Sequence, residues 1–85
     1  MYDVVLSQNA LKVYAKADRP LARKIARCLE QLAVDPRGAN MAKALTGDLA
    51  GKWRYRIGDW RVIYEIHDNQ LLVDVIDIGP RGSIY

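Results

Sequence analysis

The chain has 85 residues, of which 51% are hydrophobic, and thirteen Lys or Arg against ten Asp or Glu give it a formal net charge of +3. This length fits one small domain, residues 1–85, and excludes an enzyme that carries a separate cofactor-binding module. We expect a cytoplasmic protein, because no apolar run approaches the ~20 residues of a membrane span and the first residues lack the pattern of a secretory signal.

The first half of the sequence predicts one strand and two helices. Residues 2–6 predict a short strand, and Ser7 is suited to cap a helix over about residues 8–17, since its side chain can accept a hydrogen bond from a free backbone amide. Asp18 can cap a second helix in the same way. An apolar stripe runs along this second helix: Leu21, Ile25, Cys28, Leu29 and Leu32. The "DPRG" at residues 35–38 ends it, because proline disfavours helical angles in the residue before it.

The second half predicts strands. After a connector over residues 40–51, the hydrophobic period changes from 3.6 to 2. Three strands are expected, over residues 53–57, 60–67 and 70–79. Their two-residue hairpin turns are Gly58-Asp59 and Asp68-Asn69. The predicted fold class is α+β, of order βααβββ, with a small and mostly antiparallel sheet and the two helices packed on one of its faces.

A turn at Gly58-Asp59 sorts the residues of its two strands onto two faces. One face is apolar and predicts a core: Trp53, Tyr55, Ile57, Trp60, Val62, Tyr64 and Ile66. The other face is cationic: Lys52, Arg54, Arg56 and Arg61. Arg56 then lies directly opposite Arg61, a destabilising arrangement that a bound polyanion would neutralise. The alternative is a solvated face whose charges are balanced by Asp59, Glu65 and Asp74.

Two further groups of residues can add to this cationic face. The last strand is expected at the centre of the sheet and delivers "GPRGSIY", which brings Arg81 and Tyr85 beside the arginines. The alternative for these two residues is a surface charge and a frayed terminus. Arg23 and Arg27, four residues apart on the second helix, offer a second contact to nucleic acid, or else belong to a solvated helix face.

The sequence gives no reason to expect a metal site or a small-molecule cofactor. Cys28, the one cysteine, cannot form an internal disulfide or by itself a thiolate zinc site, and we expect it to fill the core. His67 is the one histidine, so no second imidazole is present to complete a zinc or iron site.

The segment "LTGDLAGKWRYRIGDWRVIYEI", followed by the strand into "DIGPRGSIY", resembles the RelE/ParE family of bacterial toxin-antitoxin toxins over about residues 45–85. The shared features are an "RxGxxRxxY" core and a Gly-x-Arg followed by a tyrosine near the terminus. RelE-like members of this family are ribosome-dependent endoribonucleases that cut mRNA in the A site, and ParE-like members inhibit DNA gyrase without nuclease chemistry. The resemblance therefore implies one of these two activities and a cognate antitoxin protein as partner.

For the endoribonuclease, the resemblance implies attack of the 2′-hydroxyl on the adjacent phosphate without a metal. Arg61 would hold the scissile phosphate, and Arg54 and Arg56 would stabilise the pentavalent transition state. Arg81 would support the leaving oxygen, and Tyr85 would act as base or stack on a nucleobase. The family has lysines at the positions of Arg54 and Arg56, and a guanidinium stays protonated, so the general base stays open.

The resemblance also leaves two ways for an antitoxin to act. It can place acidic or apolar side chains against Arg54, Arg61 or Arg81, because an exposed cationic face suits a charge-complementary partner. It can instead bind along the two helices and enlarge the particle beyond what the ribosomal A site admits.

Overall fold

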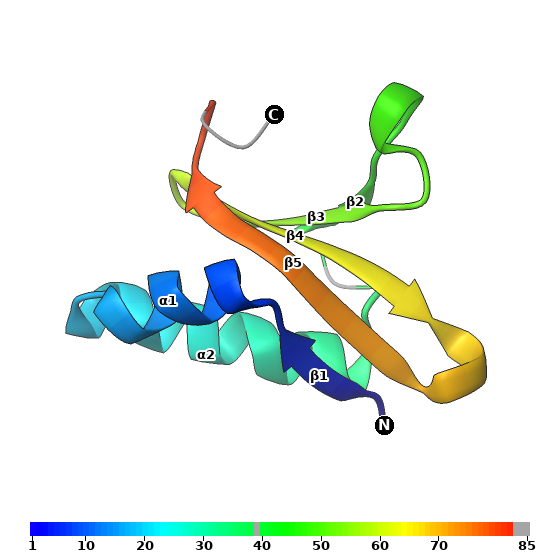
Figure 1. Ribbon diagram of the computed structural model, residues 1–85, viewed down its shortest axis with the longest axis horizontal. Helices are drawn as coiled ribbons and strands as arrows, with labels where there is room; N and C mark the ends of the chain where they lie inside the picture. Colours follow the sequence, from blue (N-terminus) through cyan, green and yellow to red (C-terminus); the bar gives the residue numbers. More distant parts are fainter. Residues whose placement is uncertain (39, 83–85) are drawn as a thin grey trace.

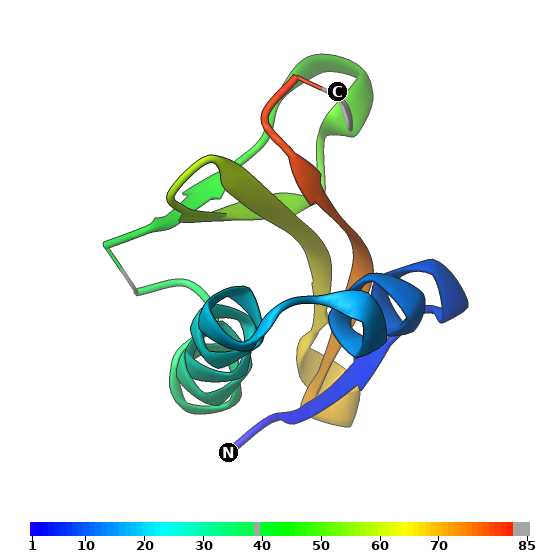
Figure 2. The ribbon, with the colours of Figure 1, turned by 90° about the vertical axis from the view of Figure 1, so that its left-hand side faces the viewer.

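Five strands form one sheet in the order β1-β5-β4-β3-β2, and both helices lie on the same side of it (Figures 1 and 2). The computed structural model describes residues 1–38 and 40–82. The chain order is β1 (Asp3–Leu6), α1 (Gln8–Lys16), α2 (Arg19–Val34), β2 (Ala42–Ala44), η1 (Gly47–Leu49), β3 (Trp53–Ile57), β4 (Trp60–His67), η2 (Asp68–Gln70) and β5 (Leu72–Pro80), where η marks a short 3-10 helix. β4 is the middle strand, and β5 lies between β1 and β4, parallel to β1 and antiparallel to β4. The predicted α+β class is therefore confirmed.

Both helices begin at the predicted caps. The Ser7 side chain accepts a hydrogen bond from the Ala10 amide at 3.1 Å, and the Asp18 carboxylate accepts one from the Leu21 amide at 2.9 Å. Asp35 ends α2, where its carboxylate accepts hydrogen bonds from the next turn, including the Gly38 amide at 2.9 Å. The longest helix has 16 residues, and no helix of the described ranges is long and apolar enough to cross a membrane.

The core lies between the helices and the sheet. Its buried members are Ala10, Ile25, Cys28, Leu32, Tyr55, Val62, Tyr64, Val73, Val75 and Ile78. Tyr64 is the largest fully buried side chain; its hydroxyl donates to the Pro36 carbonyl at 2.6 Å, and its ring stacks on Trp53 with centroids 6.5 Å apart. Burial raises the pKa of the Cys28 thiol to about 12. The expected core role of Cys28 is confirmed.

The β3–β4 hairpin has the predicted register. Ile57 pairs with Trp60 and Arg56 with Arg61 across a two-residue turn. Gly58 has a φ of 63°, a left-handed angle at the first turn position that glycine adopts without strain. Apart from Ile63, the apolar residues of both strands consequently face the helices. The arginines lie with Ile63 on the opposite face, which we call the outer face.

The connector prediction for residues 40–51 is wrong in part, because it contains β2. This strand pairs antiparallel with β3, with Lys43 opposite Arg54, so the order is βααββββ. Three residues are too few to show a period of 2 in the sequence. The strand forms because the free edge of β3 offers backbone partners, including the Arg56 amide, which donates to the Met41 carbonyl at 3.1 Å.

The predicted two-residue turn at Asp68-Asn69 is also wrong. His67 pairs with Leu72, so four residues separate β4 from β5, and Leu71 takes a left-handed φ of 50°. The reason is a contact that is distant in sequence. Arg37 donates two hydrogen bonds to the Asp68 carboxylate at 2.9 and 2.7 Å, and the Tyr2 hydroxyl donates a third at 2.7 Å.

Asp68 is expected to give the protein an acid-sensitive component of stability. The Arg37 guanidinium, with the Tyr2 hydroxyl, lowers the pKa of this carboxyl from 3.8 to about 2. Because the folded state prefers the carboxylate, its contribution is present above about pH 4 and is lost as the pH falls toward 2. Thermal unfolding across this range should therefore depend less on pH in Asp68→Asn than in the wild type. Asp48→Asn, which removes an exposed aspartate without an ion pair in the described chain, should keep the wild-type profile.

Candidate functional site

A hollow of about 300 Å³ on the outer face is lined by Arg54, Arg61, Arg81 and Gly82. β3 supplies Arg54, β4 supplies Arg61, and the chain that follows β5 supplies the other two residues. That chain leaves the sheet on the side away from the helices (Figure 1). It is held there because the Arg81 amide donates to the Asp59 carbonyl at 2.6 Å. The β3–β4 hairpin and the chain that follows β5 thus place three guanidinium groups around one concave site.

Arg61 is the most constrained of these cations. It is 7% exposed, and its Nη1 donates to the carbonyls of Gly58 at 3.0 Å and Trp60 at 3.1 Å. These two backbone bonds fix the guanidinium in place. Its Nε and Nη2 have no acceptor in the described chain, so three N–H donors remain for a ligand.

Arg54 contributes a buried donor that is not satisfied by the described residues. Its Nε is buried and has no hydrogen-bond partner among residues 1–38 and 40–82. A buried donor without an acceptor destabilises the free protein, typically by about 1–3 kcal/mol. This cost is removed when a bound anion supplies the missing acceptor.

The alternative of a face balanced by Asp59, Glu65 and Asp74 holds for Lys52, which pairs with Glu65, and not for Arg54 or Arg61, which form no ion pair among the described residues. The ion pairs of the described residues are Arg37 with Asp68 and Lys52 with Glu65, the latter at 4.0 Å. Neither Asp59 nor Asp74 reaches a guanidinium of the site. A buried arginine without a carboxylate is unusual in a folded protein, which favours a ligand that provides the negative charge.

The other predicted site residues are more dispersed. Arg56 is exposed and lines a separate hollow of about 250 Å³, together with Lys24 and Arg27 of α2. Arg23 is exposed on α2 and lines neither hollow. Tyr85 lies outside the described residues. The structure thus gathers three of the five proposed catalytic residues.

Lys43 is a cation of this face that the sequence argument missed. It is exposed, and its position opposite Arg54 in the β2–β3 ladder puts its side chain on the same face of the sheet. The alternation Ala42, Lys43, Ala44 fits a strand but is too short to predict one from the sequence. An amine beside Arg54 matters chemically, because a lysine can exchange a proton and an arginine cannot.

Replacing Arg54 with methionine is expected to raise the free energy of unfolding by about 1 kcal/mol, since it removes a buried donor without an acceptor and one of three neighbouring positive charges. Urea denaturation of the purified protein measures this change. The matched control is Arg56→Met on the same strand and face, where the side chain is exposed and the change should stay within about 0.5 kcal/mol. A less stable Arg54→Met protein would contradict the interpretation of Arg54 as a residue kept for binding.

Comparison with known proteins gives one family and two curated relatives. Residues 4–85 match the family described as "ParE toxin of type II toxin-antitoxin system, parDE". Toxin YoeB of Streptomyces coelicolor is 37% identical over 62 residues, which cover 71% of this chain and 74% of the relative. A putative RelE-like toxin protein of Escherichia coli is 28% identical over 80 residues, covering 94% of this chain and 83% of the relative.

The fold also occurs in solved structures. The toxin-antitoxin complex RelBE2 from Mycobacterium tuberculosis contains a chain that superposes with a TM-score of 0.80. The match covers 94% of this chain and 98% of that chain, at 23% sequence identity. At this identity the likeness establishes a shared fold.

Proposed function

Because the chain belongs to the RelE/ParE family of type II toxin-antitoxin toxins, we propose that it is a ribosome-dependent endoribonuclease that cuts mRNA in the A site. The observation that carries this proposal is the buried Arg61 beside Arg54 and Arg81, three guanidiniums around a hollow without a carboxylate. Guanidinium groups bind phosphate through paired hydrogen bonds, and a concave cluster can contact several oxygens of one phosphate.

Each of these arginines is assigned a role in the reaction according to its place in the hollow. The 2′-oxygen attacks the adjacent phosphorus and the bond to the 5′-oxygen breaks, which leaves a 2′,3′-cyclic phosphate and a 5′-hydroxyl. We assign Arg61 to the scissile phosphate, Arg54 to the charge that develops on the pentavalent intermediate and Arg81 to the leaving oxygen. The proton of the 2′-hydroxyl then passes to the Lys43 amine or Tyr85, and solvent water supplies the proton of the 5′-hydroxyl.

The remaining cations suit the RNA strand outside the reacting phosphate. Arg56 shares its hollow with Arg27 and Lys24, so these side chains form a second basic area near the turn that follows β3. Lys52 lies near the arginines in sequence and is drawn toward Glu65. Contacts of this kind contribute salt-dependent affinity and no chemistry.

Mapping of mRNA ends in a cell-free translation reaction tests the activity. Purified protein should produce new 5′ ends within codons at the A site, and naked mRNA without ribosomes should stay intact. Intact transcripts on translating ribosomes would contradict the proposal.

A second function is favoured by one specific finding, the match to the family described as ParE toxin. Inhibition of DNA gyrase would make the protein a binding module of the same fold, since fold does not fix function. A supercoiling assay with purified gyrase separates the two. Loss of supercoiling, with translation unaffected, would establish the gyrase inhibitor.

Neutralisation by an antitoxin is expected to depend on the arginine hollow. If acidic side chains of the antitoxin cap these arginines, the combined change of Arg54, Arg61 and Arg81 to alanine should weaken antitoxin binding, and the wild-type affinity should fall between low and physiological salt. Isothermal titration at two salt concentrations measures both effects.

The competing mechanism uses a different surface. A hollow of about 580 Å³ between α2 and the chain around Met41 is lined by apolar and polar side chains, including Val34 and Tyr55. An antitoxin helix bound there would inhibit by its bulk. Unchanged affinity of the triple variant, with little salt dependence, would exclude capping and leave this steric mechanism.

A further inference from the structure

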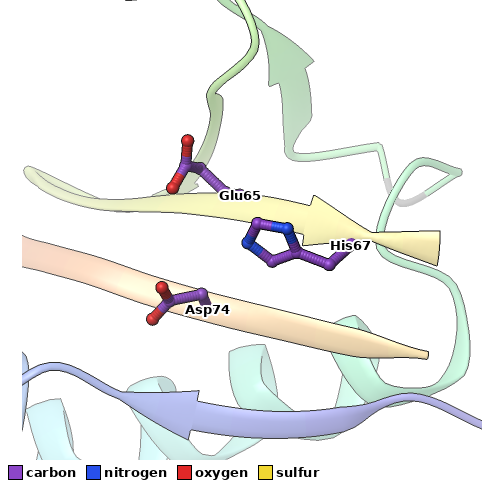
Figure 3. A group of neighbouring side chains, drawn as sticks. All are labelled: Glu65, His67 and Asp74. Carbon is purple, nitrogen blue, oxygen red and sulfur yellow. The ribbon is translucent and has the colours of Figure 1, made fainter. Parts of the chain in front are cut away.

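Three metal-ligating side chains gather on the outer face, at the end of β4 that leads into η2. Glu65 and His67 extend from β4 and Asp74 from β5, as Figure 3 shows. One ligand atom from each lies within 4.8 Å of the other two, and all three residues are half-buried. This cluster lies four to six residues along β4 from Arg61 and does not line the arginine hollow.

The strand register creates the cluster. Glu65 is the pairing partner of Asp74 across the β4–β5 ladder, and His67, two residues further along β4, shares the face of Glu65. Two carboxylates directly opposite each other in a ladder repel and destabilise the sheet. Folding alone therefore gives no reason for this pair, and a cation between the two would remove the repulsion.

The protein places little positive charge of its own beside these two carboxylates. The Lys52 ammonium is 4.0 Å from one Glu65 oxygen, the outer limit of an ion pair. The side chains of His67 and Asp74 make no hydrogen bond or ion pair within the described residues 1–38 and 40–82. Their lone pairs are free for a ligand.

We propose that Glu65, His67 and Asp74 bind a divalent transition-metal ion of the Zn²⁺ type, with water in its remaining positions. One imidazole nitrogen and two carboxylate oxygens form a donor set that such ions accept. Ligand atoms around Zn²⁺ are roughly 3.3 Å apart, so side-chain rotation closes the site without movement of the strands. One cysteine and one histidine predict no metal site from the sequence alone, but the pairing of β4 with β5 adds two carboxylates to the histidine.

Calorimetric titration of the untagged, full-length protein with Zn²⁺ alone tests the site. One ion per chain should bind, and both His67→Gln and Asp74→Asn should weaken binding by about tenfold or more. Asp48→Asn is the matched control, a carboxylate outside the cluster, and should bind as the wild type does. Circular dichroism of each variant verifies that it is folded.

Two further measurements separate a site from loose surface binding. His67 is the one imidazole of the sequence, so its ring protons give an unambiguous NMR signal that Zn²⁺ should shift with one-to-one stoichiometry. Lys52→Met removes the ammonium that competes for Glu65 and should raise the Zn²⁺ affinity about twofold or more. Wild-type affinity in folded Asp74→Asn, or no shift of the His67 signal at millimolar Zn²⁺, would overturn the proposal.

Discussion

Replacing Arg61 with alanine is expected to lower the rate of A-site mRNA cleavage by about 10²–10³-fold, the loss typical when one fixed donor to a developing negative charge is removed. Arg61 is the buried guanidinium of the site and is held by two backbone carbonyls, so no neighbour can take its position. Single-turnover cleavage on programmed ribosomes measures the rate. Arg61→Lys should recover only part of it, because an ammonium cannot make the paired contact of a guanidinium.

The control for this experiment is Arg19→Ala. Arg19 is an exposed arginine of α2 that lines neither arginine hollow, so its removal changes the net charge equally and should leave the rate unchanged. Equal losses in both variants would indicate that total charge matters and not the geometry of the hollow. Cleavage by Arg61→Ala at the wild-type rate would show that the arginine hollow is not the catalytic site.

Tyr64 is expected to have the largest effect on stability. Its replacement by alanine removes the largest fully buried side chain and should lower the free energy of unfolding by about 3–5 kcal/mol. Small domains have only about 5–15 kcal/mol in total, so this variant should lose most of its folded population at growth temperature. The urea midpoint of unfolding is the measurement.

Tyr64→Phe separates the contribution of the ring to stability from that of the hydroxyl. It keeps the packing against Trp53 and leaves the buried Pro36 carbonyl without its donor, which should cost about 1–3 kcal/mol. If this variant is as stable as the wild type, the hydroxyl contributes nothing and the loss in Tyr64→Ala is due to the cavity alone.

The cationic face could be predicted from the sequence, because side chains along a strand alternate between the two faces of the sheet. Within "RxGxxRxxY", Arg61 and Tyr64 are three residues apart and therefore lie on opposite faces. Gly58 fixes the turn and Tyr64 fills the core, whereas Arg61 lines the hollow. The motif thus combines two structural positions, Gly58 and Tyr64, with two arginines of the outer face, and the two-residue turn was enough to predict the register.

The parts that were not predictable depend on contacts between distant segments. β2 has three residues, and its existence depends on the edge of β3, so the place of Lys43 beside Arg54 could not be inferred locally. The η2 connection takes its shape from Asp68, which is held by Arg37, 31 residues away in the chain. The pairing of Glu65 with Asp74 likewise requires the true length of that connection.

The position of β5 between β1 and β4 determines when this protein can fold. β5 joins both β1 and β4, and its pairing of Asp3 with Leu72 spans 69 residues of sequence. During synthesis, the helices and the β3–β4 hairpin leave the exit tunnel before β5, so the sheet cannot close and the core still lacks Val73, Val75 and Ile78. Long-range pairing of this kind is also slow. The core of this domain is therefore incomplete until β5 has left the tunnel and paired with β1 and β4.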